Sequence, residues 1–170
     1  LRAAEERLVE QEILKHRDMH CVITLWDITK FYDSMQYDTL AQRCIEEKYG
    51  LRKIALTMIV HVSPRVLKIG KAVGRMIPSV GRSIVAGCGR SQSFARCYTN
   101  KAVDRLRESF NDSWGSGMKV YQHVDDLTHM MYHKDERILV RKAARAADVW
   151  VRQTQLLEVG ISDKTVIVPK

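Results

Sequence analysis

The sequence lacks the features of membrane, secreted and disulfide-rich proteins. Its longest apolar stretch, around residues 55–60, is far too short to span a bilayer. Residues 1–12 are charged and helix-like instead of a basic start followed by an apolar run, so no signal peptide opens the chain. The cysteines form no CxxC pair and are too sparse for a disulfide framework, so we expect buried thiols in a reducing intracellular compartment, nucleus or cytoplasm: Cys21, Cys44, Cys88 and Cys97.

Motifs of several common enzyme classes are also missing. The chain has no Walker loop, no Rossmann glycine fingerprint and no pairing of a nucleophile with a histidine. It has no internal repeat, low-complexity segment or obvious linker. The 170 residues are 45% hydrophobic and 28% charged, which is the composition of one ordinary globular domain.

The formal net charge of +8 is the first functional indication. A basic surface attracts phosphate backbones and gains affinity by releasing counterions. The alternative is a basic protein without such a partner, and charge alone does not separate the two.

The pattern of apolar residues predicts an α+β fold. After a leading helix, strands and helices alternate in an order typical of an antiparallel, ferredoxin-like sheet with helices packed on one face. Gly50 and Gly160 are expected to end two of the helices, and Asp33 and Ser34 to cap the start of one. The predicted helices are 3–16, 37–49, 51–62, 91–110 and 136–159, and the predicted strands are 21–28, 66–69, 75–77, 84–85, 118–124, 127–133 and 165–168.

Three carboxylates stand where apolar segments end. Asp27 ends an apolar strand, and Asp125 and Asp126 form the tip of a hairpin with apolar arms. Each alone is explained by a turn or a cap. If the strand lies beside the hairpin, however, Asp27 and Asp125 converge within about 5 Å, where their repulsion calls for a cation and their hard oxygens suit Mg²⁺.

Four motifs resemble those of reverse transcriptases, in the order of that family. Residues 26–35 (WDITKFYDSM) are similar to its first catalytic motif, and 123–126 (HVDD) to its YxDD box. Residues 85–92 (VAGCGRSQ), followed by Tyr98, resemble the PQGxxxSP loop and helix, and 160–165 (GISDKT) the last palm motif. The resemblance covers about residues 21–170 and is closest to group II intron and non-LTR retroelement enzymes.

The resemblance implies a polymerase palm at 21–170, preceded at 1–20 by a helix left from the fingers or a connector. It implies RNA-directed DNA polymerase activity with two Mg²⁺ ions (Mn²⁺ as a substitute), a primed RNA or DNA template and dNTPs. Asp27, Asp125 and Asp126 would hold the metals, and Lys164 would lie near the triphosphate as a proton donor. Lys164 is equally explained as an ordinary exposed lysine. The residues expected to contact substrate are Tyr32, Phe31, Gly87, Ser91 and Val124.

The sequence departs from the family pattern at two places. Val85-Ala86 stands where Pro-Gln is usual, and His123 replaces the aromatic residue of the box. The chain also holds neither a thumb nor most of the fingers, so we expect it to extend primers poorly by itself. Alternatives are a catalytically degenerate nucleic-acid-binding remnant and an RNA-templated RNA polymerase. A nucleotide cyclase would leave residues 87–91 and 164–165 unexplained.

Overall fold

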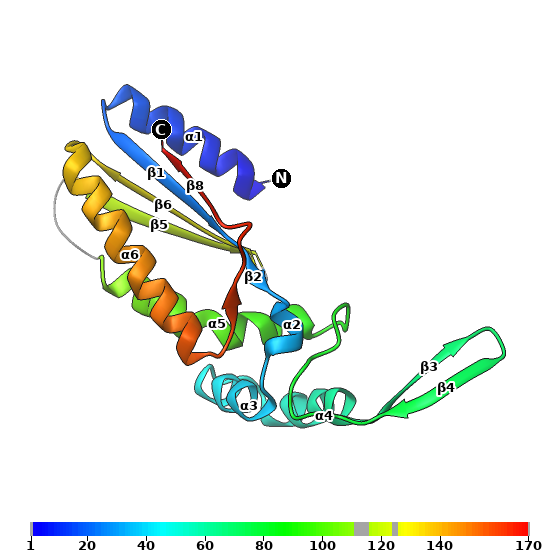
Figure 1. Ribbon diagram of the computed structural model, residues 1–170. Coiled ribbons are helices and arrows are strands. Elements are labelled where there is room, and N and C mark those ends of the chain that lie inside the picture. The colour runs from blue at the N-terminus through cyan, green and yellow to red at the C-terminus, as the bar shows by residue number, and fades with distance from the viewer. Residues whose placement is uncertain (1, 111–115, 124–125, 170) are drawn as a thin grey trace. The chain divides into compact units, whose positions relative to one another are not determined.

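The computed structural model describes residues 2–110, 116–123 and 126–169 (Figure 1). The chain forms two compact units. One contains residues 1–29 and 101–170 and is called the sheet unit. The other contains residues 30–100 and is called the helical unit. This division was not predicted from the sequence, because no glycine- or proline-rich linker marks either boundary.

The sheet unit is built on four antiparallel strands in the order β5-β6-β1-β8. β1 lies in the middle, where it pairs with β6 on one side and β8 on the other. β5 and β6 form a hairpin whose register runs from Ser116 opposite His133 to His123 opposite Asp126. The strands are β1 His20–Trp26, β5 Ser116–His123, β6 Asp126–His133 and β8 Val166–Pro169.

Helices cover both faces of this sheet because its central strands are apolar on both faces. β6 is buried at every position from Leu127 to Met131. Helix α1 (Arg2–His16) packs through Leu14 on Cys21, Ile23 and Met130. Helix α6 (Glu136–Leu156) packs on β1 and β6 through its buried stripe of Leu139, Ala146, Trp150 and Thr154. The leading helix α1, which the sequence pattern set apart, thus takes the face that α6 leaves open (Figure 1).

Both ends of helix α6 have well-known capping geometries. Oδ1 of Asp135 accepts the N–H groups of Arg137 and Ile138 at 2.8 and 3.2 Å, which makes it an N-cap. At the other end the prediction that Gly160 stops the helix is wrong. The chain reverses at Glu158, with φ 54°, and the Val159 N–H bonds back to the Thr154 carbonyl at 3.0 Å. This Schellman geometry usually takes a glycine.

Helices α1 and α3 (Tyr37–Glu46) end in the same geometry, with Asp18 at φ 53° and Lys48 at φ 57°. The predicted stop of α3 at Gly50 is therefore also too late, since α3 ends at Glu46. A glycine pattern does not reveal these ends because a side chain occupies the left-handed position in all three. Gly160 instead opens β7 (Gly160–Ile161), which pairs with β2 (Ile28–Thr29).

The helical unit consists of short helices and one projecting hairpin. The prediction that Asp33 and Ser34 cap the following helix is wrong, because the N-cap of α3 is Gln36, which makes no side-chain cap bond. Asp33 accepts the Ser83 hydroxyl at 3.0 Å instead. The expected strand at 84–85 is also absent from the described residues. The elements are α2 Phe31–Ser34, α3 Tyr37–Glu46, α4 Leu51–Val62, β3 Arg65–Ile69, β4 Ala72–Ile77 and the start of α5 Ser91–Glu108.

Candidate active site at one end of the sheet

Asp27 lies where β1 ends beside the start of β6. The last register pair of these strands is Trp26 with Leu127, so one step further lie Asp27 on one segment and Asp126 on the other. Asp27 is half-buried and Asp126 is exposed. β5 reaches the same end, where His123 pairs with Asp126. The structure therefore brings Asp27 and Asp126 to one end of the sheet.

Two further residues of the predicted site, Val124 and Asp125, lie outside the described residues. The approach of the Asp27 and Asp125 carboxylates to within about 5 Å accordingly stays a prediction.

The backbone of Asp27 is held by one turn from both sides. Asp27 falls between β1 and β2, and its carbonyl accepts the Ser162 N–H at 2.8 Å. The Asp27 N–H in turn donates to Oγ1 of Thr165 at 3.4 Å. The turn is closed by the Thr165 N–H, which donates to the Ser162 carbonyl at 3.2 Å. Because half-buried backbone groups need partners, these bonds fix the backbone that carries the Asp27 carboxylate.

Lys164 belongs to this turn. Its N–H donates to the Ser162 hydroxyl oxygen at 3.1 Å, and its side chain is exposed. Lys164, with its exposed ammonium, thus lies in the chain between Ser162 and Thr165, the two residues that hold the Asp27 backbone. Whether that ammonium meets a triphosphate stays a prediction.

A buried aromatic pair lies directly before Asp27. The rings of Trp26 and His129 are 5.5 Å apart at 83°, and the indole Nε1 is 3.3 Å from each imidazole nitrogen. The indole N–H only donates, so it needs a neutral imidazole as acceptor. Burial lowers the pKa of His129 to about 4, which keeps the ring neutral at physiological pH.

The donor set at this end fits a hard divalent cation. Within residues 2–110, 116–123 and 126–169, no three His, Cys, Asp or Glu side chains gather closely enough to hold a metal ion. Mg²⁺, however, commonly binds through only one or two carboxylates and keeps several waters. Asp27 and Asp126 at the same sheet end are donors of that kind.

Two of the residues expected to contact substrate, Phe31 and Tyr32, belong to α2 in the helical unit. Phe31 is buried, with its ring 6.4 Å from that of Tyr98 at 74°. Tyr32 is half-buried, and its ring centroid is 5.8 Å from that of Phe31. The Tyr32 carbonyl also accepts the Ile84 N–H at 2.9 Å. Of the two aromatic rings, that of Tyr32 is the one left accessible. Contact with a nucleotide stays a prediction for both.

The loop before α5 contains the other two predicted residues. Gly87 has φ 82° and follows Ala86 in a turn closed by the Cys88 N–H and the Val85 carbonyl at 3.2 Å. A positive φ at this turn position favours glycine, and the space where a Cβ would lie is open. Ser91 is buried, and its hydroxyl donates to the Cys88 carbonyl at 2.7 Å. Its contact with substrate therefore also stays a prediction.

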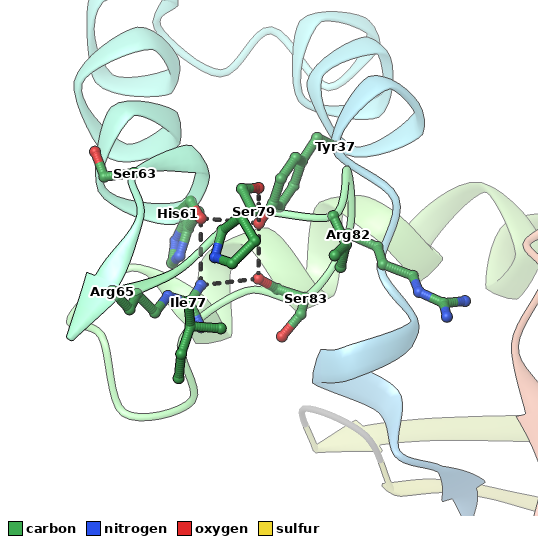
Figure 2. Close-up of a pocket in the computed structure, with 10 residues that line it drawn as sticks. Tyr37, His61, Ser63, Arg65, Ile77, Ser79, Arg82 and Ser83 are labelled. Atoms are coloured by element: carbon green, nitrogen blue, oxygen red, sulfur yellow. Dashed lines mark hydrogen bonds between the residues drawn. The ribbon is translucent and has the colours of Figure 1, made fainter. Parts of the chain in front are cut away.

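A cavity of about 150 Å³ in the helical unit is a weaker candidate (Figure 2). Its polar groups bond to one another: the Tyr37 hydroxyl lies 2.8 Å from the His61 carbonyl oxygen and 3.1 Å from that of Ser83. The Arg65 guanidinium donates to the same two carbonyls at 3.2 and 3.1 Å. Burial, together with Arg65, lowers the pKa of the His61 ring. These bonds tie the base of the β3–β4 hairpin to the unit, which is a structural role.

Sequence reasoning missed two features of the candidate site. The bond from Asp27 to Thr165 joins residues 138 apart, which no local spacing reveals. The second feature is a clustering of basic residues that the sequence itself contains: residues 48–103 contain eleven Lys and Arg and no Asp or Glu. Counting charged residues segment by segment, and not only as a total for the whole chain, would have shown where the positive charge lies.

Solved structures have the same arrangement of strands and helices. The apo telomerase of Candida tropicalis matches 99% of this chain with a TM-score of 0.65 and 11% sequence identity. The fold is similar to that of telomerase. Telomerase is related to reverse transcriptases, so the predicted fold class, an antiparallel α+β polymerase palm, is confirmed.

Two more telomerase structures from the same organism agree. One is an apo form truncated at the C-terminal domain (TM-score 0.63, 13% identity, 99% of this chain), and the other is a complex with a TWJ fragment of telomeric RNA (0.62, 10%, 96%). The chain spans about a third of these telomerase chains: 32% of the apo form, 35% of the truncated form and 29% of the form in complex with RNA. Neither a protein-family model nor a curated protein sequence matches it.

The described helices include none that is long and apolar enough to cross a membrane.

Proposed function

We propose that this chain is the catalytic palm of an RNA-directed DNA polymerase. The observation that carries the proposal is the position of Asp27 and Asp126 at one end of an antiparallel sheet with a telomerase-like fold. The four motifs that resemble those of reverse transcriptases support it, because they follow one another along the chain in the order of that family. Their similarity to the motifs of group II intron and non-LTR enzymes favours an origin in a retroelement of one of these kinds.

The carboxylates of the sheet end would carry the chemistry. Asp27 and Asp125 would hold Mg²⁺, with Asp126 in support. Two such ions activate a primer 3′-hydroxyl and stabilise the leaving pyrophosphate. The clamp formed by Ser162 and Thr165 would keep the Asp27 backbone in place during each addition.

Three other residues would contact the incoming nucleotide or the template. Lys164, exposed in the clamp, would donate a proton to the leaving pyrophosphate. The accessible ring of Tyr32 would lie under the sugar and leave no room for a 2′-hydroxyl, which selects dNTPs over ribonucleotides. Gly87 would allow the template or nucleotide to approach the backbone, since the space beside it is open.

The partners would be a primed RNA or DNA template and dNTPs. One telomerase neighbour is in complex with an RNA fragment. The net charge of +8 also predicts weak, sequence-indifferent binding to nucleic acid that falls steeply with salt. Binding that is equally strong at low and physiological salt would contradict a phosphate-tracking surface.

The second candidate keeps the fold without the chemistry, as a nucleic-acid-binding remnant of a retroelement. Val85-Ala86 favours it, because the turn closed by Val85 and Cys88 has no glutamine to order a substrate. An RNA-templated RNA polymerase is disfavoured by Tyr32, since enzymes that accept a ribose need a small or polar group near the sugar.

Single-nucleotide addition to a labelled primer tests the proposal. With the chain in excess and Mg²⁺ present, we expect slow addition that stops when the metal is chelated. Asp27→Ala should lower the rate by about a thousandfold or more, since metal stabilisation of the transition state contributes several kcal/mol. Asp148→Ala, which removes an exposed carboxylate on α6, should leave the rate unchanged. Binding of the primed template without any metal-dependent addition would favour the remnant.

A further inference from the structure

The net positive charge of the protein belongs to one of its two units. The helical unit has twelve Lys and Arg against four Asp and Glu, a net charge of +8. The sheet unit has sixteen of each and is neutral. The acid-free run at 48–103 accounts for most of this difference. A polyanion would therefore be attracted to the helical unit and not to the protein as a whole.

The β3–β4 hairpin is the most exposed part of this acid-free run. Figure 1 shows it reaching away from the end of α4. β4 is exposed along its full length, and β3 is exposed except at Arg65. A two-residue turn with Gly70 at φ 59° joins the strands, and Lys71 is its second residue. An isolated two-stranded ribbon is only marginally stable in water, so this one gains from being covered by a partner.

Basic side chains emerge on both faces and at the tip of this ribbon. Along β3 the side chains alternate, so Leu67 and Lys68 project to opposite faces. On β4 the register shifts, and Gly74 and Arg75 together lie opposite Leu67. Such a bulge redirects side chains, here bringing Arg75 toward the face of Leu67 and away from that of Lys68. With Lys71 at the tip, the ribbon has cations on each side and aliphatic residues between them.

This chemistry fits a nucleic-acid duplex better than a single strand. Residues 65–77 contain no aromatic side chain, and single-strand binders rely on aromatic rings to stack bases. A two-stranded ribbon does fit the major groove of a B-form duplex, where phosphates flank it along both edges. From residue 65 to the tip the ribbon is roughly 20 Å long, which matches about six phosphates along one strand.

We propose that the β3–β4 hairpin is an arm that lies along a groove of a nucleic-acid duplex, with Lys68, Lys71 and Arg75 contacting phosphates. The choice of nucleic acid as the polyanion rests on the proposed function. The base of the arm is fixed by Arg65, whose guanidinium is committed to the His61 and Ser83 carbonyls (Figure 2). The other three cations extend from that fixed base.

The test compares two triple variants of the full chain with equal charge change. One removes the arm cations (Lys68→Gln, Lys71→Gln and Arg75→Gln). The control removes three exposed cations of the neutral sheet unit (Lys134→Gln, Arg137→Gln and Arg141→Gln). Binding to a labelled B-form DNA duplex and to a single strand of the same length is measured by fluorescence anisotropy across a salt series, and circular dichroism confirms that both variants fold.

The arm variant should bind the duplex about tenfold or more weakly at 50 mM salt, with the slope of log affinity against log salt smaller by about 2.7. The control should lose far less of either quantity, and single-strand binding should change little in both. Equal losses in the two variants would overturn the proposal, because binding would then follow net charge alone. Unchanged duplex binding in the arm variant would also overturn it and leave the arm to a protein partner.

The outcome is separable from that of the proposed function. Asp27→Ala removes a carboxylate of the sheet unit and leaves the arm intact. If the unmodified chain adds no nucleotide but shows the arm-dependent salt slope, the polymerase proposal fails and the arm proposal stands. If addition depends on Asp27 while duplex affinity ignores the arm cations, the reverse holds.

Discussion

The two units of this protein differ in charge and in what they bury. The sheet unit is electrically neutral and covers both faces of its central strands, and it contains the half-buried Asp27. The helical unit has the whole net charge of +8, and its β3–β4 hairpin is exposed to solvent. A metal site needs carboxylates held still by a packed scaffold, whereas attraction of a phosphate backbone needs only accumulated cations. On the two proposals made above, the chemistry would belong to the sheet unit and duplex binding to the helical unit.

Hydrogen exchange should show the largest contrast between the units. Amides of β1 and β6 lie in a sheet covered on both faces, whereas those of β3 and β4 lie in an exposed ribbon. Because local opening free energies range from near zero to the global value, we expect hairpin amides to exchange about a hundredfold faster or more. Equal protection in both pairs of strands would show that the hairpin is covered in solution and would break the comparison.

Acid pH should destabilise the sheet unit through His129. Its folded pKa of about 4 lies below the ordinary 6.5, so the unfolded state binds the extra proton. The associated stability is complete above pH 6.5 and is lost as pH falls toward 4, by about 3 kcal/mol in total. Urea unfolding at pH 7, 5.5 and 4.5 measures it. His129→Gln keeps an acceptor for Trp26 and should flatten the dependence, and an unchanged slope in that variant would contradict the assignment.

Tyr32 should govern the choice of sugar. In a form of the enzyme that extends primers, Tyr32→Ala should admit ribonucleotides while barely changing the use of deoxynucleotides. Relief of overpacking of about 1–3 kcal/mol corresponds to roughly ten- to a hundredfold loss of discrimination. Tyr32→Phe keeps the ring and should keep the selection. Equal use of both sugars by the unmodified enzyme would refute the role of Tyr32 in excluding the 2′-hydroxyl and would favour an RNA polymerase.

Thr165 should have a smaller effect, through the Asp27 backbone. Thr165→Val removes the oxygen that accepts the Asp27 N–H, and a half-buried N–H without a partner costs about 1 kcal/mol. Urea unfolding should show that loss, and Thr165→Ser, which keeps the oxygen, should largely restore stability. If serine and valine behave alike, the hydrogen bond is not what the position contributes.

Much of the fold was predictable because it depends on local patterns. Apolar segments predicted the hairpin of β5 and β6, and helical spacing predicted α4 with its observed bounds. Helix ends were less predictable, because Glu158 and Lys48 adopt the left-handed conformation in place of glycine. The pairing of Asp27 with the hairpin was expected, but the clamp by Thr165 depends on how distant segments pack, which no single-sequence pattern contains.

The most direct test measures two quantities on Asp27→Ala: the rate of single-nucleotide addition at saturating duplex, and the dissociation constant of that duplex. If the sheet unit performs the chemistry and the helical unit binds the duplex, addition should be abolished while the dissociation constant stays within about twofold, since removing one carboxylate takes away no phosphate contact. Continued addition by Asp27→Ala, or loss of duplex binding together with addition, would contradict the division between the units.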